Sequence, residues 1–339
     1  MNKIFKNKSI LITGGTGSFG KKCVKILLQK FKPKKIIIFS RDELKQYEMQ
    51  LQKTYNSKKV RYLIGDVREL ERLKLAMQNV DIVIHAAALK HVPTSEYNPF
   101  EVVKTNVIGA QNVIEASYHN NVEKVIALST DKAASPINLY GATKLTSDKL
   151  FVAANNYRGK HKTRFSVVRY GNVMNSRGSV LPLFIHQAQN NGFFTITNEN
   201  MTRFNISLNE GVEFVIKSLK KMLGGEIFIP KIPSFKIVDL AYAVNPKLKK
   251  KTIGVRPGEK IHEEMITASD SVNTIEFNDY FIICPQFGFH DWKLKTYIFK
   301  NKEKNFKRVK DGFIYDSKSN KHFLSKKEIK KVIKKIIND

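Results

Sequence analysis

The chain has 339 residues and a formal net charge of +29. This length is enough to bury a large core, and no run approaches the ~18 apolar residues of a membrane span. The first six residues are too short and too polar for a signal peptide. Cys23 and Cys284 lie far apart with no cluster of Cys and His around them. We therefore expect a cytoplasmic protein without disulfides, a metal site or a membrane anchor.

The positive charge is compatible with nucleic acid, an anionic membrane surface or an anionic small substrate. However, the lysines are scattered along the chain, and no basic stripe is interleaved with the aromatic residues that single-strand binders use for stacking. We expect no nucleic-acid partner, and we interpret the charge as general lysine enrichment that also attracts a nucleotide substrate.

A glycine-rich loop stands between the first predicted strand and helix. Residues 9–12 predict a buried strand, and residues 24–28 give an apolar helical face. Glycines at such a crossing let the backbone turn and approach a pyrophosphate at the helix N-terminus. We therefore expect dinucleotide binding by the loop residues Gly14, Thr16, Gly17, Ser18, Phe19 and Gly20.

The residues that follow the second predicted strand, 36–39, indicate which cofactor binds. NAD sites usually place a carboxylate directly at this strand end, whereas an Arg accommodates a 2′-phosphate. Here Ser40 and Arg41 come first, and Lys45 lies one helical turn beyond. NADP is the expected cofactor. The alternative is that Arg41 is a solvated helix-start residue and that Asp42 binds the ribose of NAD.

Two further strands are predicted over residues 60–64 and 80–84, and a crossover helix over 102–118. The residues after the third strand are in position to border the adenine, and the small residues after the fourth let the chain pass close to the nicotinamide ribose. His85 is interpreted as a packed strand-end histidine. The residues assigned to the cofactor here are Asp66, Val67, Ala86, Ala87 and Lys90.

The fifth predicted strand, residues 125–128, leads into a segment rich in hydroxyl, carboxylate and amine groups. A helix is expected from residue 140 to 151, which places Tyr140 and Lys144 one turn apart on the same face. We expect the ammonium to lower the pKa of the phenol, so that Tyr140 becomes a base closer to neutral pH. Thr130, at the strand end, is placed to hold the same substrate oxygen. Open α/β sheets build catalysis at such crossings, and we expect Tyr140 and Lys144 to contact the cofactor as well.

The alternation of strands and helices from residue 9 to about 170 predicts an α/β fold, a Rossmann-like doubly wound parallel sheet. Beyond it the elements are shorter: helices over 209–223 and 239–244, and a strand over 226–229. We expect an NADP-binding domain at 1–170, a smaller substrate-binding lobe at 171–280 that is partly interleaved with the sheet, and a basic C-terminal extension at 281–339 that packs on the body.

The last predicted helix has an apolar face opposite a row of lysines. That face consists of Ile329, Val332, Ile333, Ile336 and Ile337. Such a helix can lie on an anionic membrane surface, but docking on the body with a solvated lysine face is the commoner arrangement. We expect docking.

Together these motifs resemble the extended short-chain dehydrogenase/reductase superfamily. Within it they resemble the inverting UDP-N-acetylglucosamine 4,6-dehydratases, which begin pseudaminic acid synthesis in bacteria that glycosylate flagellin. The most specific part is Thr130-Asp131-Lys132, followed closely by the segment 138–144. The resemblance implies UDP-N-acetylglucosamine as substrate and a homo-oligomer, either a dimer or a hexamer. It also implies substrate contacts from Lys90, Asn172, Arg203, Arg256 and Glu259.

The chemistry of a dehydratase fits the residue types at 131 and 132. A 4-epimerase that oxidises C4 and returns the hydride needs only the Thr, Tyr and Lys, whereas removal of water across C5 and C6 also needs a base and an acid. We expect Lys132 to take the C5 proton, with its pKa lowered by burial beside the nicotinamide, and Asp131 to protonate the C6 hydroxyl. The division between these two residues stays open.

Two other functions are compatible with parts of the pattern. A nucleotide-sugar 4-epimerase is the nearest alternative. A non-catalytic, NADP-sensing regulator that binds nucleic acid through its charge is an alternative of another class, although the intact Thr130, Tyr140 and Lys144 favour an enzyme.

Overall fold

A large, mainly parallel sheet forms the centre of the protein in the computed structural model, which describes residues 4–174, 179–190, 192–286 and 292–338. Over these residues the sheet has ten strands, in the order β16-β14-β15-β10-β6-β5-β4-β1-β2-β3. Its parallel strands are β1 (Ser9–Thr13), β2 (Lys35–Ser40), β3 (Val60–Ile64), β4 (Ile82–His85), β5 (Lys124–Thr130), β6 (Arg164–Tyr170) and β10 (Ile227–Pro230). The expected α/β fold is confirmed.

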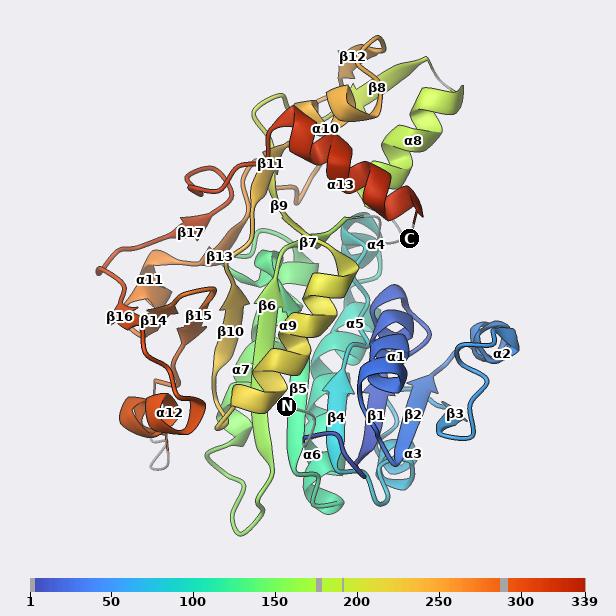
Figure 1. Ribbon diagram of the computed structural model, residues 1–339, viewed down its shortest axis with the longest axis vertical. Coiled ribbons are helices and arrows are strands. Elements are labelled where there is room, and N and C mark those ends of the chain that lie inside the picture. Colours follow the sequence, from blue (N-terminus) through green and yellow to red (C-terminus); the bar gives the residue numbers. More distant parts are fainter. Residues whose placement is uncertain (1–3, 175–178, 191, 287–291, 339) are drawn as a thin grey trace.

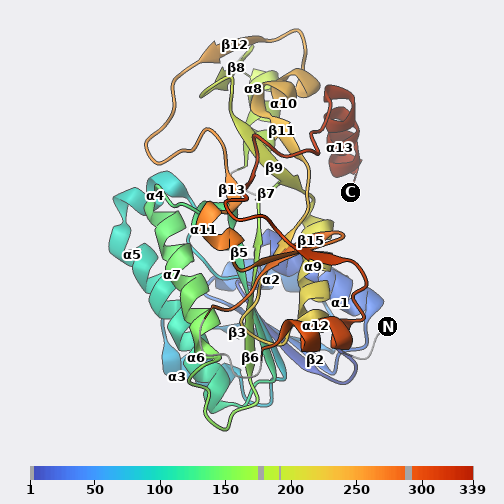
Figure 2. The ribbon, with the colours of Figure 1, turned by 90° about the vertical axis from the view of Figure 1, so that its left-hand side faces the viewer.

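Helices cover both faces of this sheet, which explains why its central strands are continuous apolar runs rather than alternating ones. All five residues of β1 are buried. Figures 1 and 2 show α1 (Ser18–Lys30) and α9 (Leu208–Lys221) on one face, and α3 (Leu70–Ala76), α6 (Gly109–His119) and α7 (Leu139–Ala154) on the other. A shorter helix, α2 (Glu43–Leu51), follows β2.

The strand order places the functional segments at one edge. Strand β1 pairs with both β2 and β4, so the order of the strands reverses at β1. Ligands of open α/β sheets bind outside the carboxyl ends of the strands at such a switch point. His85, at the end of β4, is only 1% exposed, and its Nδ1 shares a hydrogen bond of 2.8 Å with the Thr13 hydroxyl. It is a packed strand-end residue, as predicted.

The crossover helix predicted over 102–118 is interrupted. The chain forms α4 (Val92–Tyr97), α5 (Pro99–Val103) and a π-helical turn at Lys104–Ile108 before α6 begins. In this turn Asn106 is buried and bonds both the backbone N–H and the carbonyl of Leu89, each at 2.9 Å. A π-turn changes the helical period by one residue, and the apolar pattern does not reveal that change.

A lobe with its own hydrophobic core lies beyond the carboxyl ends of the strands (Figure 1). Its strands are β7 (Asn172–Val173), β8 (Phe193–Ile196), β9 (Thr202–Ile206), β11 (Ser234–Lys236) and β12 (Lys249–Thr252), and its helices are α8 (Val180–Asn190), α10 (Ile237–Val244) and α13 (Lys326–Asn338). Ile329 and Ile333 are buried in this core, where α13 packs on α10. The helix is docked, as predicted; the side chains of Ile336 and Ile337 lie outside the described ones.

The C-terminal part of the chain extends the sheet and then returns to the lobe. Its elements are β13 (Glu264–Ile266), α11 (Ala268–Ser271), β14 (Thr274–Phe277), β15 (Tyr280–Ile283), α12 (Leu294–Asn301), β16 (Phe306–Arg308) and β17 (Tyr315–Asp316). β17 pairs with β13 in an antiparallel manner. Cys23 and Cys284 are free thiols. In the part of the chain that the structure describes, none of the helices is long and apolar enough to cross a membrane.

A buried ion pair ties α7 to the sheet. Arg169 is 2% exposed and Asp148 1% exposed, and Arg169 Nη2 lies 3.2 Å from Asp148 Oδ2. Ser129 donates to the same carboxylate oxygen at 2.7 Å, and Arg169 Nη1 donates to the Met265 carbonyl at 3.0 Å. Burial raises the pKa of Asp148, while the Arg169 charge opposes that rise.

Replacement of Arg169 by Met should therefore leave an uncompensated carboxylate in the interior. We expect the free energy of unfolding to fall by about 3–5 kcal/mol, measured by chemical denaturation. As a control, Lys30→Met removes an exposed pair with Glu213 and should change the free energy of unfolding by about 1 kcal/mol or less. Equal effects of the two substitutions would contradict this account.

Candidate active site

The glycine-rich loop forms a close backbone approach at the end of β1. Gly14 has a φ of +65°, and a Cβ there would lie 3.0 Å from the Cα of Ala87. Gly17 caps α1 without any side-chain hydrogen bond to the free amides of the helix. Such an uncapped N-terminus attracts a phosphate group. The geometry of the loop therefore fits a dinucleotide, and it brings Gly14 against the predicted segment 86–87.

The ends of β2 and β3 lie next to this loop. Thr16 and Ser40 share a hydrogen bond of 2.9 Å between their hydroxyls. Arg41, with a half-exposed side chain, lies 3.5 Å from Asp66 Oδ2, which Arg68 also contacts at 2.7 Å. Asp42 instead caps α2, because its carboxylate accepts from the Lys45 backbone N–H at 2.9 Å and pairs with the Lys45 ammonium.

Tyr140, Thr130 and Lys144 come together at the end of β5, where α7 begins. Thr130 lies near the Tyr140 hydroxyl and favours its ionised form, while its own hydroxyl donates to Asp131 Oδ1 at 3.0 Å. Lys144 is 3% exposed. Burial raises the pKa of Tyr140 to about 12, and the cation that opposes this rise is Lys132. Burial also lowers the pKa of Lys144, an effect that Asp148 partly offsets. The expectation that Lys144 would bring the pKa of Tyr140 towards neutrality is thus wrong for this structure, because burial of the phenol dominates.

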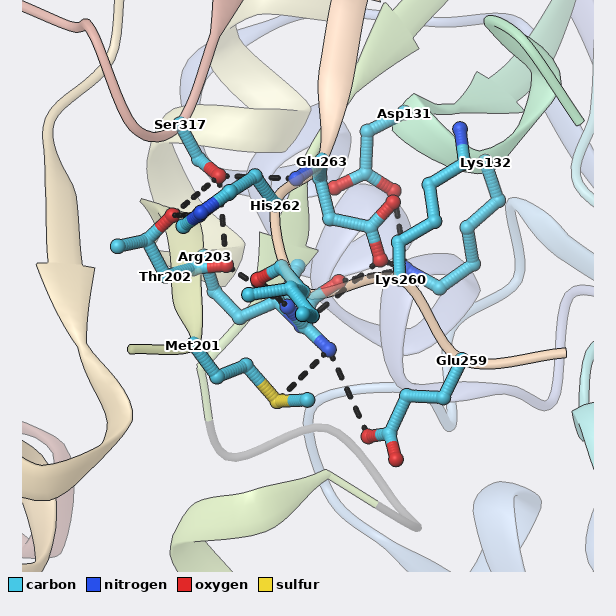
Figure 3. A network of polar contacts seen from close by, with 12 residues as sticks. Asp131, Lys132, Met201, Thr202, Arg203, Glu259, Lys260, His262, Glu263 and Ser317 are labelled. Atoms are coloured by element: carbon cyan, nitrogen blue, oxygen red, sulfur yellow. Dashed lines mark hydrogen bonds and ion pairs between the residues drawn. The ribbon is translucent and has the colours of Figure 1, made fainter. Parts of the chain in front are cut away.

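Two residues after Thr130, a lysine lies between two buried carboxylates (Figure 3). Asp131 and Lys132 belong to a 3₁₀ turn, Asp131–Ala133. Lys132 Nζ lies 3.1 Å from Asp131 Oδ1, 2.9 Å from Glu263 Oε1 and 3.2 Å from Asn172 Oδ1. The side chains of Asp131 and Glu263 are 0% and 2% exposed, whereas that of Lys132 is 20% exposed. Lys132 is therefore the member of this group whose side chain is partly exposed, while its amine contacts the two buried carboxyl groups.

The three groups alter one another's proton affinities. Burial alone would lower the pKa of Lys132, but the charges of Asp131 and Glu263 outweigh it and raise that pKa. Burial raises the pKa of Asp131, although Lys132 opposes the rise. The pKa of Glu263 is lowered, because Lys132 and Arg203 together outweigh its burial. The sequence predicted a lowered pKa for Lys132, which is the wrong direction, because the charges of Asp131 and of Glu263, which was not foreseen, outweigh burial.

A turn from the C-terminal half of the chain closes against the start of α7. Asn138 caps this helix by accepting from the Gly141 N–H at 2.7 Å, and its amide donates to the Gly258 carbonyl at 2.7 Å. Gly258 has a φ of +73°, and a Cβ on it would lie 3.0 Å from Asn138 Cβ. A glycine at position 258 is thus required for this close contact with the N-terminus of α7.

The residues that the resemblance assigned to the substrate lie around this turn. Arg203 is buried, and its Nη2 lies 3.5 Å from Glu259 Oε1. Glu259 Oε2 accepts from the Arg256 backbone N–H at 3.4 Å, and the Arg256 side chain is exposed. Lys90 is close enough to Lys132 for their charges to interact. Lys90 and Arg203 thus interact with the charge of Lys132, and Asn172 contacts its amine at 3.2 Å.

Two residues of this site were not singled out from the sequence. Asp148 lies one helical turn after Lys144, and the spacing of four residues could have indicated it. Glu263 precedes a three-residue strand and follows an ordinary polar segment, so no sequence pattern marks it. Its position is fixed by Ser317, which exchanges hydrogen bonds with the Glu263 backbone at 2.8 and 2.9 Å. Among the described residues, no group of three or more His, Cys, Asp or Glu could hold a metal ion.

Comparison with known proteins finds relatives that match nearly the whole chain. A relative from Campylobacter jejuni strain 81-176, named UDP-N-acetylglucosamine 4,6-dehydratase (inverting), is 57% identical over 331 residues, which are 97% of this chain and 98% of the relative. A UDP-glucose 4-epimerase of Rickettsia bellii is 45% identical over 287 residues, 83% of this chain and 84% of the relative. The crystal structure of Pen from Bacillus thuringiensis has a TM-score of 0.88 and 41% identity, covering 98% of this chain and 99% of Pen.

A family model described as polysaccharide biosynthesis protein matches residues 10–285. This match covers most of the chain and includes the glycine-rich loop, α7 and the turn at 256–259. The chain therefore belongs to the polysaccharide biosynthesis protein family, and over nearly its whole length it is related to the inverting UDP-N-acetylglucosamine 4,6-dehydratases.

Proposed function

We propose that the protein is an NADP-dependent UDP-N-acetylglucosamine 4,6-dehydratase, a lyase that inverts C5 of the sugar. The observation that carries this proposal is the pair of Asp131 and Lys132 beside Thr130 and Tyr140: Asp131 Oδ1 lies 3.1 Å from Lys132 Nζ and accepts from the Thr130 hydroxyl at 3.0 Å. Oxidation at C4 needs only a base for the hydroxyl proton and a hydride acceptor. An acid and a base next to it are what the removal of water requires in addition.

In the proposed reaction, Tyr140, assisted by Lys144 and Thr130, takes the proton of the C4 hydroxyl. Bound NADP supplies the acceptor for the C4 hydride and the hydride that is later returned to C6. The C4 ketone acidifies C5, and Lys132 removes the C5 proton. Asp131 protonates the C6 hydroxyl, which leaves as water. Reprotonation of C5 from the opposite face inverts that carbon.

The pKa directions support this division of roles for Asp131. A general acid must carry a proton near the operating pH, and burial raises the pKa of Asp131. Of the pair, Lys132 is the residue whose side chain is partly exposed, and we propose it as the group that reaches C5. Its raised pKa means that it must release a proton before it acts as a base.

NADP is proposed rather than NAD because of the side chains at the end of β2. Arg41 is half exposed and available to a 2′-phosphate, for which an arginine is well suited. Asp42, the alternative ligand for a ribose, is already engaged as the cap of α2 and with Lys45. A carboxylate occupied in this way is a poor acceptor for ribose hydroxyls.

The proposed substrate contacts, oligomeric state, location and pathway rest on the resemblance to the inverting UDP-N-acetylglucosamine 4,6-dehydratases. We propose that the lobe of residues 171–280 binds the UDP-sugar through Asn172, Arg203, Arg256 and Glu259, with Lys90 from the sheet side. We also propose that the protein is a cytoplasmic homo-oligomer and that its product enters pseudaminic acid synthesis for flagellin or surface glycans.

A nucleotide-sugar 4-epimerase is the second candidate, because relatives at 45% identity bear the name UDP-glucose 4-epimerase. Such an enzyme would use Thr130, Tyr140 and Lys144 in the same way. It would, however, have no use for an acid and a base held beside them by a buried carboxylate at residue 263. This difference favours dehydration.

The two candidates predict products of different mass. Incubation with UDP-N-acetylglucosamine and NADP should give a sugar nucleotide that is lighter by one water, as measured by mass spectrometry. A product of unchanged mass would identify an epimerase and contradict the proposal.

Lys132→Met should abolish formation of the 6-deoxy-4-keto sugar, with a loss of at least about 100-fold, while the variant still binds NADP. The measurement is the rate of water loss, with cofactor binding followed by fluorescence. Lys149→Met, on the exposed side of α7, serves as the control and should keep the full rate. An undiminished rate in Lys132→Met would exclude the proposed role.

Arg41→Ala should weaken NADP by about tenfold or more, the effect of one charge-assisted contact, and leave NAD affinity nearly unchanged. Titration of both cofactors by calorimetry gives the ratio. If both affinities fall equally, Arg41 does not contact the 2′-phosphate.

A further inference from the structure

Glu263 is a buried carboxylate that the proposed reaction does not yet use. Its Oε1 lies 2.9 Å from Lys132 Nζ, and its Oε2 is buried with no hydrogen-bond partner within the described residues. Ser317, from the segment after β17, fixes its backbone through two hydrogen bonds. The carboxylate is thus held against the amine, next to the carboxyl group of Asp131 (Figure 3).

The protons of the three groups can be counted for the elimination step. Lys132 must be a neutral amine to remove the C5 proton, and Asp131 must hold a proton to protonate the C6 hydroxyl. Because burial raises the pKa of Asp131, we take Asp131 to hold its own proton before the elimination, so the proton that Lys132 gives up needs another acceptor. Of the groups that contact the amine, Asn172 offers an amide oxygen, and Glu263 is the remaining carboxylate.

We propose, on the basis of the proposed dehydratase function, that Glu263 takes up the proton of Lys132 when substrate is bound, and so frees the amine to attack C5. The step is balanced: the ammonium and the carboxylate become an amine and a carboxylic acid, with no exchange of protons with solvent. Glu263 acts through Lys132 and is therefore a positioning residue.

The partial exposure of Lys132 explains why this transfer follows substrate binding. Lys132 keeps 20% of its side chain exposed, so the ion pair lies at the border of the site. A sugar that covers this exposed part removes nearby water, and loss of solvation penalises both charges of an ion pair. Arg203 Nε, 3.8 Å from the same Glu263 oxygen, favours the carboxylate and keeps the ion pair as the resting state.

Several other charged or titratable groups lie near Lys132 and Glu263 and affect their protonation. They are Asp131, Arg203, Lys90, Lys260 and Tyr140.

Glu263→Gln keeps the shape of the side chain but cannot accept the proton. We expect dehydration to slow by about 100-fold, while C4 oxidation, measured as reduced nicotinamide on mixing with substrate, proceeds at the wild-type rate. Lys132 must then release its proton to solvent. The ratio of variant to wild-type dehydration rate should therefore rise with pH, by about tenfold per pH unit below the pKa of Lys132. A purely structural role would slow both steps and give a flat ratio.

Two matched variants sharpen the test. Glu264→Gln changes the neighbouring carboxylate, which bonds the Ser135 hydroxyl at 2.8 Å, and should keep both rates. Glu263→Asp retains a proton acceptor one methylene farther away, so its dehydration should be slower than wild type but with a ratio that stays flat with pH. If Glu263→Gln fails to fold, as judged by Tm and NADP binding, the Asp variant decides, and a ratio that rises with pH would contradict the proposal.

The outcomes separate this inference from the proposed function. If the wild-type protein releases no water from UDP-N-acetylglucosamine, the proposed function fails. If the wild type releases water and Glu263→Gln does so at the same rate, or with equal losses in oxidation and dehydration, only the role of Glu263 is overturned.

Discussion

The placement of one ammonium group between two buried carboxylates is the interaction on which the site depends. Asp131 and Glu263 are almost inaccessible to solvent, and neither would be tolerated as a lone charge in that position. Removal of one partner from a buried pair leaves an uncompensated charge, which is costly. The three residues must therefore be present together, and their mutual charges decide which of them carries a proton.

This requirement connects segments that are far apart in the sequence. Asp131 and Lys132 follow β5, Asn172 begins the lobe, and Glu263 precedes β13. The backbone of Glu263 is in turn fixed by Ser317, close to the C-terminal helix that packs into the core of the lobe. In the proposed function, the sheet supplies the residues for oxidation at C4, whereas the later segments supply the carboxylate beside the acid–base pair. Substitutions in the C-terminal extension can thus affect chemistry at residue 132 without contact with substrate.

The sequence was sufficient for those parts of the structure that local pattern determines. The strand-loop-helix around Gly14, the parallel sheet, and the approach of Thr130 to Tyr140 follow from spacing and apolar periodicity. The π-helical turn at Asn106 was missed, because apolar spacing does not mark the single turn in which i→i+5 hydrogen bonds replace i→i+4 ones. The pKa directions of Tyr140 and Lys132 were wrong for a different reason. That of Tyr140 depends on burial, and that of Lys132 on the charges of Asp131 and of Glu263, which is 131 residues away from Lys132 in the chain and carries no local signal.

On this fold, the reaction type depends on the proton-transfer groups that lie beside the site of oxidation. A Thr-Tyr-Lys set at the end of a parallel strand provides reversible oxidation of an alcohol, and that chemistry alone does not distinguish an epimerase from a dehydratase. The distinction requires proton-transfer groups within reach of the neighbouring carbons, and such groups are stable in a buried site only when their charges are balanced. Residue 263 provides that balance from a segment outside the dinucleotide-binding half. In the proposed function, the choice between epimerisation and dehydration therefore depends on how the later segments pack against the sheet, and not on α7 alone.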